Sequence, residues 1–455
     1  MSTYAPHTPE EIEQMLGFLG LGSLEELFDV VPAALRLAGG LQLPPGRPEP
    51  DVLAAMEELA AANRPVGRGL VCFAGGGAYD HEVPPVVRAL ASRSEFVTSY
   101  TPYQPEVAQG VLQALFEFQT LLARLAGVPV ANASLYDGAA AVVEAVNLAA
   151  AATGRTRVWV SVGLNPSWRA VLATFAAGTG HDLVEVPLRG GITQWPAAGP
   201  GAGEPPHEPA PAAVVVAYPN YLGCLEDLAA ARRLCDRTGA VLVVAFDPVA
   251  AGVLRSPGDW GADVVVGEGQ ALGMPLSFGG PYLGLFACTD QFVRRLPGRL
   301  VGETLDAEGR TAYVTTLRAR EQDIRREKAT SNVCTNQTLM AVTAAIQLGW
   351  LGPSGLAEVA LRSARATAYC RAGLLALDGI QPLTEAPVLR EFALALPVDG
   401  AVVVERLLEE GFLAGVPLEA PYTAGMPGGL LVAVTERRTR AEIDAFVAAV
   451  DKAVR

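Results

Sequence analysis

Five mostly apolar runs, spaced by segments with helical periodicity, dominate the middle of the chain. Their residues are largely Val, Ala, Leu and Phe with little polar alternation, which is the pattern of strands buried on both faces of a sheet. Short apolar strands separated by helices predict a mostly parallel sheet covered by helices on both sides, an α/β fold. The five predicted strands are 158–162, 183–187, 213–217, 240–246 and 263–266.

Helical periodicity is clear on either side of this region. The segment 105–126 begins with Pro and is rich in Leu and Phe, which predicts a long amphipathic helix, and 139–152 predicts an Ala-rich helix. After a helix predicted at 338–350, the chain mixes helix and strand patterns and predicts a small α+β domain. The elements of that domain are helices near 355–377 and 438–453 and strands near 390–397 and 430–434.

The first residues predict a helical arm. Thr8-Pro9-Glu10-Glu11 combines a capping Thr, a Pro in the first turn and early acids, which together begin a helix. Such an arm either wraps a neighbouring subunit or packs on its own chain. The Pro/Gly-rich segment 197–211 predicts a surface loop. We therefore expect three parts, which are the N-terminal helical arm (1–65), a large α/β domain (66–330) and a small C-terminal α+β domain (331–455).

Composition narrows the class of protein. Hydrophobic residues make up 50% of the chain and charged residues 18%, so either another subunit covers much of the surface or the sequence follows a bias towards Ala, Gly, Arg and Pro. The net charge of −14 without a basic tract argues against nucleic acid as a partner. No apolar run of membrane-spanning length and no signal or transit pattern is evident, so we expect a cytoplasmic protein away from membranes.

The spacing of cysteines and histidines argues against a disulfide scaffold and against a metal site. Six cysteines are scattered without a C-x-x-C pattern, which suits reduced thiols in the cytosol. The four histidines do not cluster at metal-ligand spacing. We therefore expect any chemistry to use other residue types.

Two positions suit pyridoxal phosphate (PLP). Asp247 follows the run 240–246, at the strand end where α/β sheets place ligands, and a carboxylate there can hold the pyridinium nitrogen of PLP. An equally simple interpretation is a helix N-cap, because Asp followed by Pro often begins a helix. Ser134 lies just before the helix at 139–152, where free backbone N–H groups can bind phosphate. Asp137 would oppose a phosphate there, and Ser and Asp also cap helices.

The chain has only two lysines, Lys328 and Lys452. A Schiff base with PLP needs an amine that can lose its proton, which the guanidinium of arginine does not do. The segment 261–271, where such a lysine is expected, contains none. Lys328 lies in a helical charge run far along the chain from Asp247, which argues against this role. A self-sufficient PLP enzyme that uses Lys328 stays open as an alternative.

Two polar segments predict parts of a substrate cleft. One is a Pro-braced loop before the helix at 105–126, and the other follows the basic run 318–328 and leads into the helix at 338–350. Their hydroxyls and amides suit the edge of a ligand site or an interface. The competing interpretations are a rigid loop whose tyrosines cover the core and a solvated helix face. The candidate residues are Tyr100, Thr101, Tyr103 and Gln104 in the first segment and Thr335, Asn336 and Gln337 in the second.

Longer runs of sequence, spread over nearly the whole chain, make a family resemblance specific. These runs are TSYTPYQPEVAQG at 98–110, NASLYDGAA at 132–140, GLNPSWRAVL at 163–172, YPNYLG at 218–223, GADVVVGEGQALGMPLSFGGPYLG at 261–284 and REQDIRREKATSNVCTNQ at 320–337. With them the chain resembles the P-protein of the glycine cleavage system (glycine dehydrogenase, decarboxylating), in the N-terminal or alpha subunit of its split bacterial form. The resemblance implies a regular helix where this chain has the Pro/Gly-rich segment 197–211, and we expect that difference to lie on the surface.

The resemblance implies the fold-type-I PLP-transferase architecture and a role in glycine catabolism. It implies an alpha2beta2 heterotetramer in which the beta subunit binds PLP covalently and this chain shapes the shared cleft. The assembled oxidoreductase would decarboxylate glycine and pass the aminomethyl group to the lipoylated H-protein, with T-protein and L-protein as further members of the system. Ser134 and Asp247 would then be vestigial cofactor positions. A purely structural subunit is the remaining alternative.

Overall fold

The computed structural model describes residues 6–37, 39, 41–97, 101–196, 210–418, 422 and 427–455. It consists of two compact units, Met1–Asn63 and Arg64–Arg455. Tyr100 and most of the predicted loop 197–211 lie outside the described residues.

The N-terminal unit contains the helices α1 (Pro9–Leu19) and α2 (Glu49–Ala61) and short 3-10 turns at Glu25–Phe28 and Ala33–Leu35. The predicted start of α1 is confirmed, since Thr8 and Glu11 form a reciprocal capping box. No described side chain of this unit is buried. Its large apolar side chains therefore form no core within the unit.

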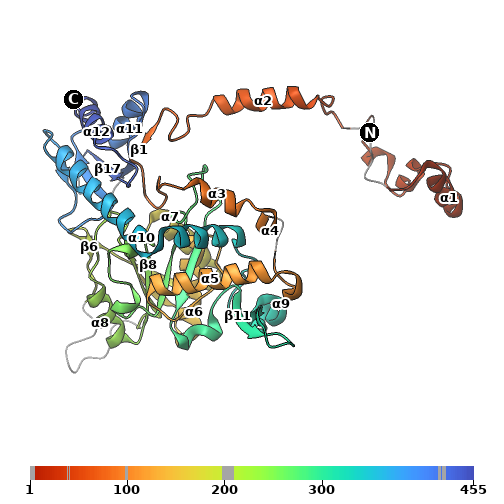
Figure 1. Ribbon diagram of the computed structural model, residues 1–455, viewed down its shortest axis with the longest axis horizontal. Coiled ribbons are helices and arrows are strands. Elements are labelled where there is room, and N and C mark those ends of the chain that lie inside the picture. The colour runs from red at the N-terminus through yellow and green to blue at the C-terminus, as the bar shows by residue number, and fades with distance from the viewer. Residues whose placement is uncertain are drawn as a thin grey trace. The chain divides into compact units, whose positions relative to one another are not determined.

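The second unit is built around a seven-stranded sheet in the order β2-β10-β9-β8-β7-β3-β4 (Figure 1). The strands β9, β8, β7, β3 and β4 run parallel, and β10 runs antiparallel to both of its neighbours. The predicted mostly parallel sheet is confirmed, and each predicted run overlaps one strand. The bounds are β2 Val130–Ala131, β3 Arg157–Ser161, β4 Asp182–Val186, β7 Ala213–Tyr218, β8 Val241–Phe246, β9 Val264–Glu268 and β10 Gly284–Cys288.

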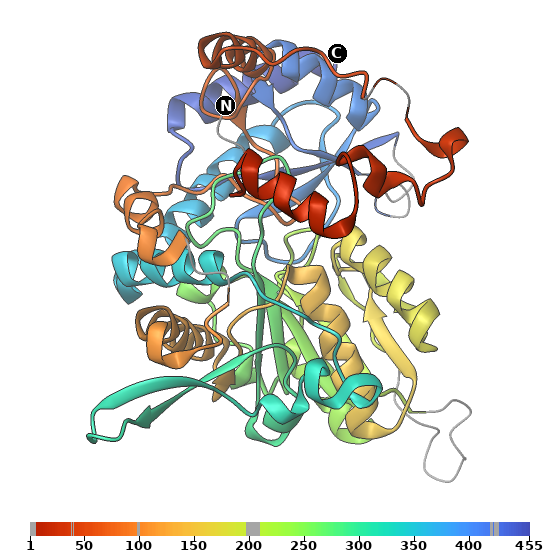
Figure 2. The ribbon, with the colours of Figure 1, turned by 90° about the vertical axis from the view of Figure 1, so that its right-hand side faces the viewer.

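Helices cover both faces of this sheet, which explains the continuous apolar runs. In β7, Val214 and Val216 point into one core, and Val215 points into the core on the other face. The helices α6 and α7 cover one face, while α5, α8 and the first half of α10 cover the other (Figures 1 and 2). Their bounds are α5 Gln109–Ala126, α6 Gly138–Thr153, α7 Pro166–Thr179, α8 Leu228–Thr238 and α10 Thr338–Leu375.

The 38-residue helix α10 links the two layers of the unit. Gly352, just before Pro353, has φ 58° and ψ −178°, so the helix is kinked where two helices were predicted. By length and composition α10 is long and apolar enough to span a membrane, although no run of that length was expected from the sequence. However, Ala341 and Ala344 lie fully buried in the core of this fold, the behaviour of a central packing helix.

A second sheet forms the C-terminal layer, with strand order β13-β14-β17-β16 and antiparallel pairing throughout. β1 (Val71–Cys72) pairs in parallel with β15 (Phe412–Leu413), and the ring of the next residue, Phe73, stacks on Phe446 with centroids 3.9 Å apart. Residues near 71–73 therefore pack with the C-terminal layer, and the limits of 65 and 330 stay predictions. The remaining bounds are β13 Gln381–Pro382, β14 Glu391–Leu396, β16 Val416–Leu418, β17 Gly428–Ala433, α11 Gly400–Glu409 and α12 Arg440–Ala453.

Two predicted helical segments differ from the structure. The segment from Pro105 forms a 3-10 turn, and α5 begins only at Gln109, because Ala108 has the non-helical φ of −129°. The charge run around Lys328 forms only short turns, since Arg326 has φ 51°. The other elements include the hairpins β5–β6 and β11–β12, of which the second extends away from the sheet (Figure 2). Their bounds are α3 Pro85–Ala91, α4 Ser94–Val97, β5 Leu188–Arg189, β6 Ile192–Thr193, β11 Leu300–Leu305, β12 Thr311–Thr316 and α9 Gln322–Arg325.

Candidate functional site

A cleft lies at the carboxyl ends of the parallel strands β7, β8 and β9, where open α/β sheets place their ligands. The start of β14, in the C-terminal layer, closes one side of this cleft. Its walls are aromatic and amide side chains, with four charged groups among them. The lining residues include Tyr79, Asn165, Trp168, Asn220, Tyr221, Asp247, Glu268, Arg390 and Glu391.

Asp247 has both of its oxygens engaged by this chain. Its Oδ1 accepts from the backbone N–H of Val249 at 2.9 Å and of Ala250 at 3.4 Å, so Asp247 caps a turn that leads into the 3-10 turn Ala250–Gly252 instead of the predicted helix. Its Oδ2 forms an ion pair with Arg390, a guanidinium that is 5% exposed and lies 3.5 Å over the ring of Tyr79. The position that would face a pyridinium nitrogen is therefore occupied by an arginine.

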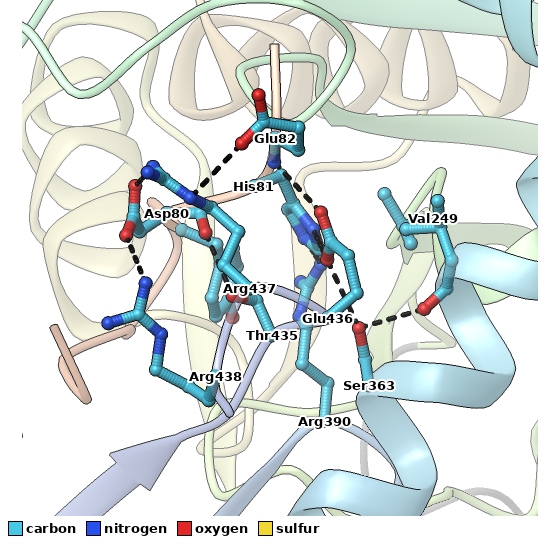
Figure 3. A network of polar contacts seen from close by, with 12 residues as sticks. Asp80, His81, Glu82, Val249, Ser363, Arg390, Thr435, Glu436, Arg437 and Arg438 are labelled. Carbon is cyan, nitrogen blue, oxygen red and sulfur yellow. Dashed lines mark hydrogen bonds and ion pairs between the residues drawn. The ribbon is translucent and has the colours of Figure 1, made fainter. Parts of the chain in front are cut away.

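Arg390 also begins a buried polar chain, which Figure 3 shows from close by. Its Nη1 lies 2.6 Å from His81 Nε2, and His81 Nδ1 lies 2.6 Å from Glu436 Oε2. Because the guanidinium can only donate, His81 accepts through Nε2 and carries its proton on Nδ1 towards Glu436. These hydrogen bonds join three segments that are far apart in the sequence, so they fix the position of Arg390 in the cleft wall.

Glu268 occupies the N-terminus of α6. Its Oε2 accepts from the backbone N–H of Gly138 at 2.9 Å, and its Oε1 accepts from those of Gln270 and Leu283, both at 2.9 Å. Burial raises the pKa of Glu268 to about 7 against the pull of these three donors. The indole of Trp168 lies so close that a Cβ on Gly138 would meet it at 2.3 Å. A carboxylate and an indole thus fill the place where a phosphate would bind the helix N-terminus.

The residues of this cleft do not fit PLP, although the fold implied by the sequence uses it. PLP needs a free carboxylate for its ring nitrogen, donors for its phosphate and an amine for its aldehyde. Asp247 is paired with Arg390, and Gly138 is bonded to Glu268. In the segment where the lysine is expected, Gln270 is 1% exposed and exchanges hydrogen bonds of 2.9 and 3.1 Å with the backbone of Tyr79.

Replacing Glu391 with Gln is expected to stabilise the chain relative to wild type as the pH rises. Glu391 accepts from Gly76 N at 2.6 Å and from Tyr79 Oη at 2.9 Å, and burial raises its pKa from 4.5 to about 7. The folded chain therefore takes up a proton that the unfolded chain releases, so its free energy of unfolding falls as the pH rises from 4.5 through 7. Gln is uncharged and keeps both contacts, since a tyrosine hydroxyl can also accept.

The measurement is the Tm of the purified wild-type and Glu391→Gln chains at matched concentration. The Tm difference should move in favour of the variant between about pH 5 and about pH 8.5. A difference that is constant over this range would contradict the raised pKa.

A second polar cluster unites the two predicted cleft segments. Arg299, 6% exposed, donates to Asn336 Oδ1 at 3.0 Å and to Tyr103 Oη at 3.2 Å. Asn336 Nδ2 in turn donates to the carbonyl of Ala133 at 2.7 Å and to Ser134 Oγ at 3.2 Å. The loop from 132 to 138 therefore runs from this cluster to the N-terminus of α6, so the cluster and the cleft share one backbone segment.

The structure brings most, but not all, of the predicted site residues together. Tyr103, Thr335 and Asn336 meet at Arg299, and the backbone N–H of Gln337 donates to Ser134 Oγ at 3.2 Å. Thr101 Oγ1 is buried without a hydrogen-bond partner among the described residues, and the side chain of Gln104 is exposed. Tyr100 lies outside the described residues. The catalytic roles of all these residues stay predictions.

Sequence reasoning missed Arg299, Arg390 and Glu268. Glu268 lies inside the run where a lysine was sought, so a carboxylate at that position was a usable signal. Arg299 and Arg390 carry no local pattern, because their contacts come from residues far away in the sequence. Among the described residues, no group of three His, Cys, Asp or Glu side chains is arranged to hold a metal ion.

Comparison with known proteins points to one family. Residues 2–450 match the family model "Glycine cleavage system P-protein". The chain is 48% identical over 447 residues to the probable glycine dehydrogenase (decarboxylating) subunit 1 of Moorella thermoacetica, and 46% identical over 444 residues to that of Geotalea uraniireducens. In both cases the match covers 98% of each chain.

Solved structures agree with the predicted fold. A crystal structure of the glycine decarboxylase (P-protein) of the glycine cleavage system, in inhibitor-bound form, matches with a TM-score of 0.90 and 47% identity over 99% of this chain and 100% of that one. A sphingosine-1-phosphate lyase of Burkholderia pseudomallei, at 16% identity and TM-score 0.65 over 93% and 94% of the chains, shares the fold alone. The fold-type-I PLP-transferase architecture is confirmed.

Proposed function

This chain belongs to the glycine cleavage system P-protein family, and we propose that it is the alpha subunit of a two-chain glycine decarboxylase whose beta subunit holds the cofactor. The name "subunit 1" of its relatives supports a second subunit. An alpha2beta2 heterotetramer in the cytoplasm is the assembly that we propose.

This proposal rests on the groups of the cleft that would anchor PLP, because each of them already has a partner within this chain. Asp247, Gly138 and Gln270 each have partners from this chain at the three places where PLP would be anchored. A chain of this fold that cannot anchor PLP itself needs a second chain that does. The large apolar side chains of the N-terminal unit, such as Phe18 at 91% and Val30 at 88% exposure, support extensive contacts with another surface.

The proposed reaction removes the carboxylate of glycine as carbon dioxide and transfers the aminomethyl group to the lipoyl group of the H-protein. PLP bound by the beta subunit supplies the electron sink for this reaction. The contribution of this chain is to shape the shared cleft with Tyr103, Thr335 and Asn336 and to keep water out of it. T-protein and L-protein would act in the later steps of the same system.

A test of this assignment uses the purified chain with and without a beta-like partner. The lone chain is expected to stay colourless when incubated with PLP and to release no carbon dioxide from glycine, because it lacks a placed amine. The mixture of both chains should become yellow and decarboxylate glycine. Lys328→Ala should leave the activity of the mixture unchanged, since Lys328 is exposed on a short turn.

The same experiment distinguishes the proposed two-chain enzyme from a self-sufficient PLP enzyme that uses Lys328. A chromophore in the lone chain that borohydride fixes and that Lys328→Ala abolishes would overturn our proposal in favour of Lys328. Lack of decarboxylation by the mixture of both chains would also overturn it.

A further inference from the structure

A buried arginine without an acidic partner lies where the two cleft segments meet. Arg299 is more than nine-tenths buried, and all acceptors of its Nη hydrogens are neutral. A cation buried among neutral acceptors keeps an uncompensated charge, which is costly. The acceptors are Thr335 Oγ1 at 3.4 Å, Asn336 Oδ1 at 3.0 Å, Tyr103 Oη at 3.2 Å and the carbonyl oxygen of Cys334 at 3.0 Å.

No carboxylate of the described residues forms an ion pair with Arg299. Glu321 interacts with this positive charge only through space, without a hydrogen bond or ion pair to it, and burial raises the pKa of Glu321. The guanidinium therefore has no contacting anion among the described residues, and a bound anion would balance its charge.

Two hydroxyl groups around Arg299 are set up as outward donors. Tyr103 Oη and Thr335 Oγ1 each use an oxygen lone pair to accept from the guanidinium, so their protons point to other sides. Within the described chain neither proton has an acceptor. Tyr103 is 52% exposed, so this residue lies at a surface that a partner or ligand can reach.

We propose that Arg299, Tyr103 and Thr335 form a subsite for the carboxylate of the amino-acid substrate, with the two hydroxyls as the contacting donors and Arg299 as their positioning residue. The inference rests on the proposed function. Two hydroxyl donors match the two oxygens of a carboxylate, and one buried positive charge balances its single negative charge.

Arg299 would act on the substrate carboxylate through the two hydroxyls and not by direct contact. This arrangement suits a carboxylate that is released as carbon dioxide during the reaction. A guanidinium fork that held the carboxylate directly would stabilise the bound substrate more than the transition state, in which that charge disperses. Here the four Nη hydrogens are already used by protein acceptors. Arg299 therefore orients and polarises the hydroxyls without gripping the substrate itself.

The experiment measures the complex of this chain with its beta subunit. Arg299→Met is expected to raise the KM for glycine about tenfold, the range of a lost charge-assisted contact, with a smaller change in kcat. The inhibition constant of methylamine, which is glycine without its carboxylate, should stay the same. Arg299→Lys should restore part of the loss, since it keeps the charge.

Tyr103→Phe and Thr335→Val serve as second variants, because each removes one donor and keeps the shape of the side chain. Each should raise the KM for glycine and spare methylamine, and each should have little further effect in the Arg299→Met background. The matched control is Tyr369→Phe, because exposed Tyr369 also accepts from an arginine, Arg440, at 3.2 Å but lies on α10 away from the cluster.

Three outcomes overturn the inference. They are an unchanged KM for glycine in Arg299→Met and Thr335→Val, equal weakening of glycine and methylamine, and loss of bound cofactor in place of a changed KM. If the wild-type complex decarboxylates glycine while any of these holds, only the carboxylate subsite fails. If the wild-type complex is inactive, the proposed function fails first.

Discussion

Arg390→Met is expected to lower the free energy of unfolding by about 3–5 kcal/mol, the cost of leaving a buried charge without its partner. The substitution removes the ion pair with Asp247 and the donor to His81 Nε2. Oδ1 of Asp247 would keep its contacts with the backbone, but the charged Oδ2 would face the apolar side chain of the new methionine. We therefore expect a larger stability loss than for replacement of an arginine in an exposed ion pair.

Urea denaturation of the purified chain measures this effect. Arg310→Met is the control, because Arg310 pairs with Asp306 and Glu308 on an exposed hairpin, where a pair contributes about 0–1 kcal/mol. The double variant Asp247→Asn/Arg390→Met should lose less than Arg390→Met alone, since no charge remains unpaired. Equal losses in Arg390→Met and Arg310→Met would show that the cleft is not held by this ion pair.

Asn336→Ala is expected to lower glycine decarboxylation by the two-chain complex about 100-fold, the effect of misplacing a site by roughly 1 Å. Asn336 joins the loop that contains Ala133 to the segment that enters α10, and it also accepts from Arg299. Without its amide, a backbone carbonyl and a guanidinium both lose a partner. The loop at Ala133 and the segment that enters α10 can then move apart.

The measurement compares kcat/KM of the complexes with wild-type chain, Asn336→Ala, Tyr103→Phe and the control Gln113→Ala. Gln113 is an exposed amide on α5 whose side chain bonds, among the described residues, only to Glu117. Unchanged activity in Asn336→Ala and Tyr103→Phe would favour the alternative of a purely structural subunit.

The strands could be predicted because burial on both faces leaves a direct mark on the sequence. The run before Asp247 is apolar at every position, since alternate residues enter different cores. β10 (Gly284–Cys288) was not predicted, because it is short and follows directly on a Gly- and Pro-rich stretch that carries no strand pattern. The kink of α10 was predicted as a break between two helices, since Pro353 interrupts the pattern.

The candidate site was harder to predict, because it is assembled from distant segments. Tyr103 and Arg299 are 196 positions apart, and Ser134 and Asn336 are 202 positions apart. Polar residues before helices indicated the two cleft segments, but a single arginine in an arginine-rich chain gave no sign of its burial. The pairing of Asp247 with Arg390 likewise depends on how the C-terminal layer folds back over the sheet.

The carboxylate of Glu268 at the start of α6 decides whether a substituted form of this chain could bind PLP itself. Introducing a lysine between 261 and 271 would not by itself create a PLP site. Glu268 would still occupy the position of the phosphate, and Arg390 would still pair with the carboxylate that would bind the ring nitrogen. Anchoring the cofactor in this chain would also require releasing Asp247 from Arg390 and Gly138 from Glu268.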